Sequence, residues 1–227
     1  MPESGKPKTQ QSAAVVAMNK IKELIFTGEL IADSNHLESE LAERLGMSRT
    51  PIREATIMLE AHGLLDVQPR KGVRIKAISV QDMADIYEIL TELESLAAQR
   101  AAARKPDKKE LKGLLDAINQ MDTALASEDR EAWAKADENF HSELVRLGGN
   151  RHIVEMVKVV NDQVRRARSI TLHMRPLPVK SNKDHRKLCT AILKGDTEKA
   201  REIHRNHRKN ASDLLISLMN TSGLKRV

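Results

Sequence analysis

The stretch that decides the expected fold is ESELAERLGMSRTPIREATIMLEAHGLLDVQPRKGVRIK, residues 38–76. Its first part places Leu41, Ala42 and Leu45 at the spacing of one face of a helix. Gly46 follows, and glycine tolerates the left-handed conformation that commonly ends a helix. The pattern therefore predicts a short helix over residues 38–45 that ends in a tight turn.

A second short helix is predicted directly after this turn. Ser48 can accept a backbone N–H bond as its N-cap, and Pro51 is tolerated in a first helical turn. Gly63 ends the pattern. The apolar face of this helix consists of Ile52, Ala55 and Leu59.

Two arginines occupy the other face of the second helix. Arg49 and Arg53 lie one helical turn apart, so their guanidinium groups project in the same direction. Such groups can bind guanine O6 and N7 or phosphate oxygens, which is the chemistry of a helix that reads the DNA major groove. Taken alone, two arginines on an amphipathic helix are more often solvated charges.

A hairpin with a basic tip is predicted next. Leu65 and Val67 alternate with polar residues, and Val73 and Ile75 resume the alternation after a turn at Arg70-Lys71-Gly72. A tip of this kind can follow phosphates or enter the minor groove. The order of helix, helix and hairpin therefore favours DNA reading over solvated charges.

The basic residues of the N-terminal part are clustered. Residues 1–78 hold eleven Lys and Arg against ten Asp and Glu, a net charge of only +1. The basic side chains on the proposed DNA side are Arg49, Arg53, Arg70, Lys71, Arg74 and Lys76. Their grouping, and not the overall charge, indicates the DNA-binding face.

Composition limits the class of protein. The 227 residues are 40% hydrophobic, enough for a real core, and the net charge of +6 is compatible with a polyanionic partner. The single Cys189 excludes an internal disulfide and suits the core better than nucleophilic chemistry. No apolar run is long enough for a membrane span or a signal sequence, so we expect a cytoplasmic protein that does not bind membranes.

The expected fold is mainly α: an N-terminal winged helix-turn-helix and a C-terminal antiparallel α-helical bundle. A further helix is predicted from Ala13 to Thr27. After residue 79 the sequence is helical with five breaks, rich in Ala, Leu, Glu and Lys, and only 2% aromatic over the whole chain. The expected parts are a disordered leader (1–11), the winged domain (12–78), the all-helical domain (79–220) and a tail (221–227).

The run ELAERLGMSRTPIREA, residues 40–55, resembles the helix-turn-helix core of the GntR family of bacterial transcription regulators. The resemblance implies that Ser48, Arg49, Thr50 and Arg53 contact DNA and that Arg70, Lys71 and Gly72 form the wing. Departures lie upstream, where the family usually has Pro-Gly, Leu and a basic residue. This chain has Ala32-Asp33, His36 and Ser39 at those places.

The C-terminal part contains a candidate metal site. Asp137 and His141 lie on one face of a predicted helix over about residues 129–147, and His185 and His207 belong to two other predicted helices. Three imidazoles and one carboxylate suit zinc, nickel or manganese better than calcium. Since 8 histidines in a chain of this length can align by chance, the spacing alone leaves the site open.

Segments around these residues resemble the FCD domain of the FadR-like branch of GntR regulators. They are DENFH at residues 137–141, HRKLCTAILKGD at residues 185–196 and AREIHRNH at residues 200–207. The resemblance implies an effector-binding and dimerisation domain over roughly residues 79–220, with a metal held by Asp137, His141, His185 and His207. His204 stands where the family commonly has an apolar residue, so it is either partly exposed or a competing ligand.

The expected function is sequence-specific DNA binding by a homodimer on a near-palindromic double-stranded operator, modulated by a small carboxylate effector beside the metal. Arg165 and Arg168 are candidates for binding the effector. Leu90 replaces an Arg that many members use for an acidic effector. The alternatives are a purely structural metal or a metal-dependent enzyme, and the enzyme lacks an obvious general base beside Asp137 and His141.

Overall fold

The computed structural model describes residues 12–223, so the leader expected at residues 1–11 and residues 224–227 of the expected tail lie outside the described residues. The chain forms two compact units that divide between Lys76 and Ala77. Ile78 falls within the range expected for the winged domain, but it belongs to an apolar cluster of the second unit. Each unit is described by itself below.

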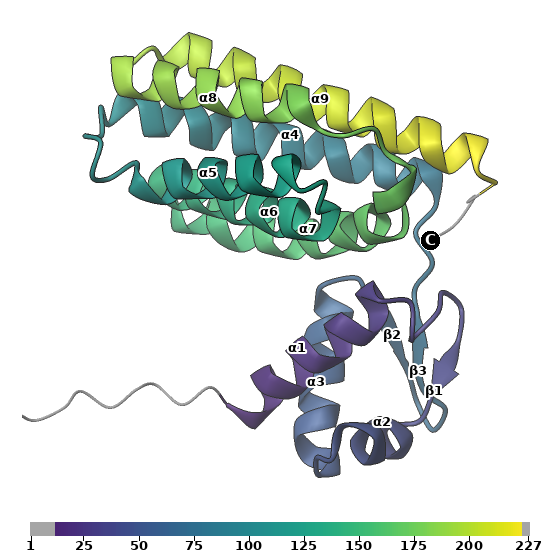
Figure 1. Ribbon diagram of the computed structural model, residues 1–227. Helices are drawn as coiled ribbons and strands as arrows, with labels where there is room; N and C mark the ends of the chain where they lie inside the picture. The colour runs from purple at the N-terminus through teal and green to yellow at the C-terminus, as the bar shows by residue number, and fades with distance from the viewer. Residues whose placement is uncertain (1–11, 224–227) are drawn as a thin grey trace, which may run out of the picture. The chain divides into compact units, whose positions relative to one another are not determined.

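The first unit contains three helices and a small sheet (Figure 1). Its elements are α1 (Ala13–Phe26), β1 (Asn35–His36), α2 (Glu38–Leu45), α3 (Arg49–Ala61), β2 (Leu65–Gln68) and β3 (Gly72–Ile75). Gly46 adopts the left-handed conformation expected between α2 and α3, with φ of 62°. The helix pair and the hairpin are therefore confirmed.

The sheet has one strand more than expected. Its order is β1-β3-β2, with both pairs antiparallel. We missed β1 because it spans only two residues, Asn35 and His36, which pair with Arg74 and Val73 of β3. A strand this short has no alternation of apolar and polar residues to detect.

The second unit is a helical domain. Its elements are α4 (Val80–Ala103), α5 (Lys112–Ala126), α6 (Arg130–Leu147), α7 (Arg151–Ile170), the 3-10 helix η1 (Leu172–Met174), α8 (Val179–Lys194) and α9 (Thr197–Thr221). The helix α4 packs against α6, α7, α8 and α9 and lies at the centre of the bundle (Figure 1). The expected fold class, mostly helical with a winged N-terminal unit and a helical C-terminal unit, is confirmed.

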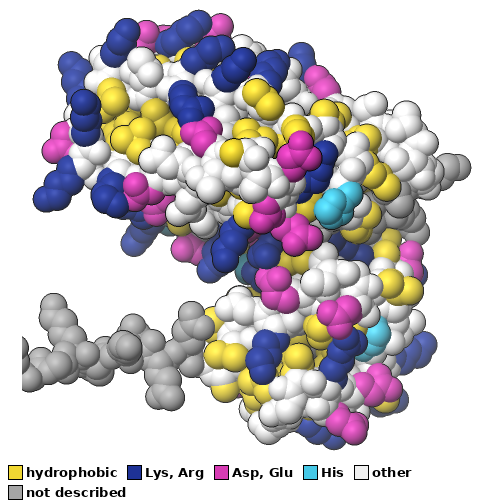
Figure 2. Space-filling model, in the orientation of Figure 1, with side chains coloured by type: hydrophobic (Ala, Val, Ile, Leu, Met, Phe, Trp, Pro, Cys, Tyr) yellow, Lys and Arg dark blue, Asp and Glu magenta, His cyan; other side chains and the backbone are white. Residues whose placement is uncertain are grey.

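Charged residues are distributed without a dominant sign on the visible face. Figure 2 shows Lys and Arg side chains interspersed with Asp and Glu over the helical unit.

In the described part of the chain, no helix is long and apolar enough to cross a membrane. Cys189 is buried, and burial raises the pKa of its thiol to about 12. A thiol with such a pKa stays protonated and is a poor nucleophile at neutral pH.

Candidate metal centre and nucleic-acid interface

The predicted recognition face of α3 points away from the apolar core of its unit. Ile52, Ala55 and Leu59 are fully buried, whereas Arg49 and Arg53 are exposed. The helix thus presents both guanidinium groups to solvent while its other face is fixed by packing. This arrangement is what base or phosphate contacts require.

Ser48 occupies the predicted N-cap position but does not cap the helix. Its backbone is extended, with φ of −71° and ψ of 162°, and its side chain makes no capping hydrogen bond. The expectation that its hydroxyl accepts a backbone N–H is therefore wrong. Ser48 and Thr50 are both exposed beside Arg49.

The tip of the wing is formed by Arg70, Lys71 and Gly72. Arg70 and Lys71 are exposed. Gly72 has φ of 84°, and a Cβ placed there would lie 2.2 Å from the carbonyl oxygen of His36. Only glycine can pass so close to the β1 backbone, so this residue allows the short third strand to pair.

Two other basic residues of the proposed DNA side are paired within the unit. Arg74 Nη2 lies 2.7 Å from Asp33 Oδ1, and Lys76 Nζ lies 3.7 Å from Asp66 Oδ1. These pairs occupy Arg74 and Lys76 with neighbouring carboxylates. They are therefore weaker candidates for phosphate contacts than Arg70 and Lys71.

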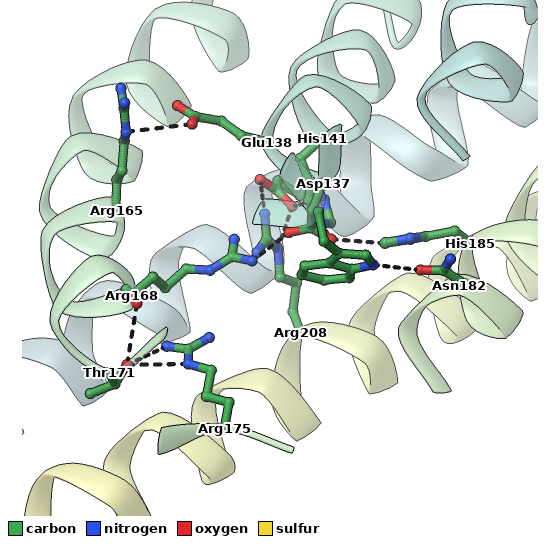
Figure 3. A network of polar contacts seen from close by, with 12 residues as sticks. Asp137, Glu138, His141, Arg165, Arg168, Thr171, Arg175, Asn182, His185 and Arg208 are labelled. Atoms are coloured by element: carbon green, nitrogen blue, oxygen red, sulfur yellow. Dashed lines mark hydrogen bonds and ion pairs between the residues drawn. The ribbon is translucent and has the colours of Figure 1, made fainter. Parts of the chain in front are cut away.

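In the helical unit, the structure brings together the four predicted metal ligands. Asp137 and His141 come from α6, His185 from α8 and His207 from α9, and all four are buried. Each offers one ligand atom, and these atoms all lie within 4.8 Å of one another. Asp137 Oδ1 is 3.6 Å from His141 Nε2 and 3.6 Å from His185 Nε2 (Figure 3). We call these four residues the Asp137 group.

The Asp137 group has the properties of a cation site. Asp137 Oδ1 and both ring nitrogens of His141 and of His185 are buried without a hydrogen-bond partner. Leaving a buried polar atom unpaired costs about 1–3 kcal/mol, so a cluster of such atoms indicates a missing partner. Burial holds the pKa values of His185 and His207 well below the usual value, which keeps these imidazoles neutral and able to donate lone pairs. The residues fit a divalent cation.

Of the two candidate arginines, only Arg168 reaches the Asp137 group. Its Nη2 atom lies 2.5 Å from Asp137 Oδ2. Burial by itself raises the pKa of Asp137, but Arg168 and His141 outweigh it and hold this pKa well below its usual value. Arg165 instead lies with its Nε 3.5 Å from Glu138 Oε2, away from Asp137 (Figure 3).

Arg175 is a further cation in this region. Its Nε and Nη2 donate to Thr171 Oγ1 over 3.1 and 2.8 Å. Burial lowers the pKa of Arg175 to about 10, and the nearby Arg168 adds to this effect. In the described part of the chain its side chain thus donates to a neutral hydroxyl, and the carboxylate of Asp137 acts on its charge only from a distance.

A second buried polar network, which the sequence analysis missed, adjoins the Asp137 group. Arg208 binds Glu94 with two bonds, Nε to Oε2 over 2.6 Å and Nη2 to Oε1 over 2.7 Å. His204 Nε2 lies 2.8 Å from Glu94 Oε2. His204 is fully buried, so the interpretation of it as partly exposed is wrong. We call Glu94, His204 and Arg208 the Glu94 network.

The sequence did hold a signal for this network. Leu90, Glu94, Ala98 and Ala101 follow helical spacing along α4, and all four are buried. A charged residue on an otherwise apolar stripe is rarely buried without a partner. Glu94 could therefore have been suspected, although its partner Arg208, 114 residues away, could not.

The comparisons with known proteins divide the chain at the same place. The family model "Bacterial regulatory proteins, gntR family" matches residues 14–75, and the model "FCD domain" matches residues 85–210. Both matches fall on the segments that carry the resemblances described above.

Similar proteins are transcriptional regulators. The chain is 42% identical over 131 residues to an uncharacterized HTH-type transcriptional regulator of Agrobacterium vitis, a match that covers 57% of this chain and 77% of the relative. It is 30% identical over 194 residues to an uncharacterized HTH-type regulator, YdhC, of Bacillus subtilis, covering 83% and 86%. The solved structure of E. coli McbR/YncC has a TM-score of 0.80 at 20% identity over 92% of this chain and 99% of that one, which shows a shared fold.

Proposed function

Because this chain belongs to the GntR family of bacterial transcription regulators and carries an FCD domain, we propose that its DNA binding is controlled by a small carboxylate bound beside a divalent metal. The domains and relatives are those of DNA-binding regulators and not of enzymes. The observation that carries the proposal is the convergence of buried, unpaired donor atoms in the Asp137 group.

The proposed DNA contacts lie at the start of α3 and at the tip of the wing. They are the exposed residues Ser48, Arg49, Thr50, Arg53, Arg70 and Lys71, together with the half-buried Gly72. Arg49 and Arg53 would reach base edges in the major groove, and Arg70 and Lys71 would follow phosphates. In a homodimer two such units would bind the two halves of a near-palindromic operator.

The metal would be zinc, nickel or manganese. Three neutral imidazoles and one carboxylate form a donor set that these ions accept and that calcium disfavours. Asp137 would use Oδ1, because Arg168 already occupies Oδ2. When bound, the ion would supply a positive charge that a ligand carboxylate can coordinate.

Arg168 and Arg175 are the residues best placed to favour an acidic effector. Leu90, where many family members have an Arg, is fully buried among apolar side chains and offers no charge. Arg175 is a cation that donates to a hydroxyl, so a carboxylate would supply a counter-ion in contact with it. The acid-binding side of the site would thus be formed by α7 and the segment after it.

The test is selection of DNA from random sequence by the full-length protein, repeated after metal removal and with a panel of small carboxylic acids. We expect an enriched near-palindromic site whose affinity changes by about 5- to 150-fold with the correct acid, and only when metal is present. Absence of any enriched sequence at physiological salt would contradict the DNA-binding part. Weaker operator binding with the acid would mean that the effector releases the protein from DNA. Stronger binding would mean that the effector holds the protein on DNA.

A purely structural metal is the second candidate, because Arg168 is already paired with Asp137 and Leu90 is apolar. Trp133 can separate the two, since it lies one turn before Asp137 on α6 and its Nε1 donates to Asn182 Oδ1 over 2.8 Å. A structural metal predicts that Trp133 emission responds to metal removal and to no acid. An effector site predicts a second response to the acid in the metal-loaded protein.

A further inference from the structure

The ring of His141 lies between two buried carboxylates. Its Nε2 is 3.6 Å from Asp137 Oδ1, and its Nδ1 is 3.2 Å from Glu94 Oε2. His141 Nδ1 and Glu94 Oε2 are close enough for a hydrogen bond, but in the observed orientation the ring does not direct Nδ1 at this oxygen. His141 is therefore the residue at which the Asp137 group and the Glu94 network meet.

Glu94 is held rigidly and in its charged form. Two bonds from Arg208 and one contact from His204 fix both carboxylate oxygens, and all three residues are fully buried. The guanidinium of Arg208 bonds to both oxygens of this carboxylate and stabilises its charged form inside the bundle. A carboxylate in this state can only accept hydrogen bonds.

We propose that Glu94 is a positioning residue that holds His141 with its proton on Nδ1, which leaves the Nε2 lone pair directed at the metal site of the Asp137 group. This inference rests on the metal proposed above. A ligating histidine commonly donates its other ring N–H to a carboxylate, which fixes the tautomer and raises the basicity of the ligand nitrogen. Here the carboxylate comes from α4, a helix that contributes no residue to the Asp137 group.

A cation bound directly by Glu94, His141 and His204 is the competing arrangement, because these three residues also offer ligand atoms within 4.8 Å of one another. The guanidinium of Arg208 opposes it. This group already binds both oxygens of Glu94, so a cation there would place two positive charges on one buried carboxylate. The inference therefore requires one ion per chain, on the Asp137 side.

The position of Glu94 also links metal binding to α4. This helix follows the connector from the DNA-reading unit, and its Glu94 reaches α6 through His141 and α9 through Arg208. Fixing His141 on an ion would therefore fix α4 against α6. The link gives the metal a physical route to the helix that follows the reading unit in the chain.

The test compares Glu94→Gln with Glu92→Gln in the full-length protein. Glu92 is two residues away on the same helix and pairs with Arg201 and Arg205 at the surface, so it controls for the loss of one charge. Gln has one acceptor oxygen where Glu94 has two, and Arg208 and His204 compete with His141 for it. Glu94→Gln therefore removes the negative charge that faces Nδ1 and weakens the hold on its proton.

Zinc affinity is measured by competition with a chromophoric chelator. We expect Glu94→Gln to weaken zinc binding about 10- to 100-fold, with Glu92→Gln unchanged. Equal affinity of Glu94→Gln and the parent protein would overturn the inference, as would two zinc ions per chain. Absence of zinc, nickel and manganese binding by the parent protein would instead refute the metal proposal.

A second measurement does not depend on whether a variant at position 94 folds. Nitrogen NMR of the metal-free parent protein with labelled histidine reports the tautomer of each imidazole, and His141→Asn assigns the signal. We expect Nδ1 to be protonated and Nε2 to be unprotonated in His141. The reverse tautomer would overturn the positioning role whatever the metal affinity.

Discussion

The two units differ in where their candidate functional residues lie. They are at the surface in the winged unit and inside the core in the helical unit. In the winged unit Arg49 and Arg53 are exposed, and the buried polar side chains described there are Lys22 and Thr56. In the helical unit the Asp137 group and the Glu94 network are buried inside the bundle. Substitutions should therefore alter binding with little effect on stability in the first unit, and should alter both in the second.

The buried polar groups of the bundle lie next to two apolar clusters. Along α4, Met83 and Leu90 belong to one cluster and Ala98 to the other, with Glu94 between them. Along α9, His204, His207 and Arg208 lie between Ala200 and Leu215, which again belong to different clusters. On both α4 and α9 the buried polar groups are thus flanked by apolar residues.

The largest effect is expected from Arg208→Met. This change removes the double bond to Glu94 and leaves a buried carboxylate without its main counter-ion, so we expect a loss of about 3–5 kcal/mol in the free energy of unfolding. Urea unfolding of the metal-free protein would measure it. Arg205→Met is the matched control, because Arg205 on the same helix is 59% exposed and pairs with Glu92 at the surface. A cost for Arg208→Met no greater than that of Arg205→Met would remove the contrast between buried and exposed charges.

Acid should destabilise the metal-free protein through the buried histidines. Burial lowers the pKa of His204 to about 4, whereas in the unfolded chain it takes up a proton near pH 6.5. Between these values the unfolded state binds more protons, so the free energy of unfolding falls by up to about 1.4 kcal/mol per pH unit for each such histidine as the pH decreases. Asp137 and Glu94, with lowered pKa values, add a further loss below about pH 4.

Urea unfolding at a series of pH values would measure this slope. His204→Gln should reduce it, and His173→Gln should leave it unchanged, because the His173 side chain is 74% exposed. A parent protein whose stability is constant from pH 7 to 5 would contradict the neutral, buried state of these histidines.

A smaller effect is expected for DNA binding. Arg49→Ala and Arg53→Ala should each weaken binding to the selected operator by about 1–3 kcal/mol while leaving the free energy of unfolding within about 0.5 kcal/mol. Fluorescence anisotropy with labelled operator would measure the affinity. Arg44→Ala controls for the loss of an exposed positive charge, since Arg44 pairs with Glu29. Parent-like affinity of both α3 variants would show that this face does not read DNA.

The smallest effect is expected in the unfolding free energy when either of two serines at the starts of helices is replaced. Ser79 accepts a bond from the Asp82 backbone N over 3.0 Å, so Ser79→Ala should cost about 1 kcal/mol of unfolding free energy. Ser48 makes no such bond, so Ser48→Ala should cost less than about 0.5 kcal/mol. Thermal unfolding of both variants would measure the difference. Equal costs would mean that Ser48 caps α3 in solution.

Most of the fold could be predicted from local sequence. The helix pair of residues 38–61, the hairpin tip at Arg70 and the breaks between the later helices depend on neighbours a few residues away. The strand β1 could not be predicted, because it exists only through pairing with β3. The capping role of Ser48 was wrong because sequence shows a residue that is able to cap and not the rotamer that it adopts.

For the candidate metal site, the sequence showed residue types that can bind a metal, and the family resemblance indicated which four of them act together. Spacing alone could place only Asp137 and His141 on one face of α6, because the other two donors lie on helices far along the chain. It also could not distinguish Arg168, which meets Asp137, from Arg165, which meets Glu138. These two arginines lie less than one helical turn apart on α7. Which of them points towards Asp137 therefore depends on how α7 packs against α6.

The sequence by itself determined which segments are helical, where they end, and that two arginines share one face of a short helix, because these follow from periodicity and from the conformational limits of glycine and proline. Only the tertiary structure decided which charges are buried together. Glu94 and Arg208 lie 114 residues apart, and their pairing inside the bundle depends on the packing of α4 against α9. A charge can remain in such a place only when a distant partner compensates the loss of water, and local sequence does not name that partner.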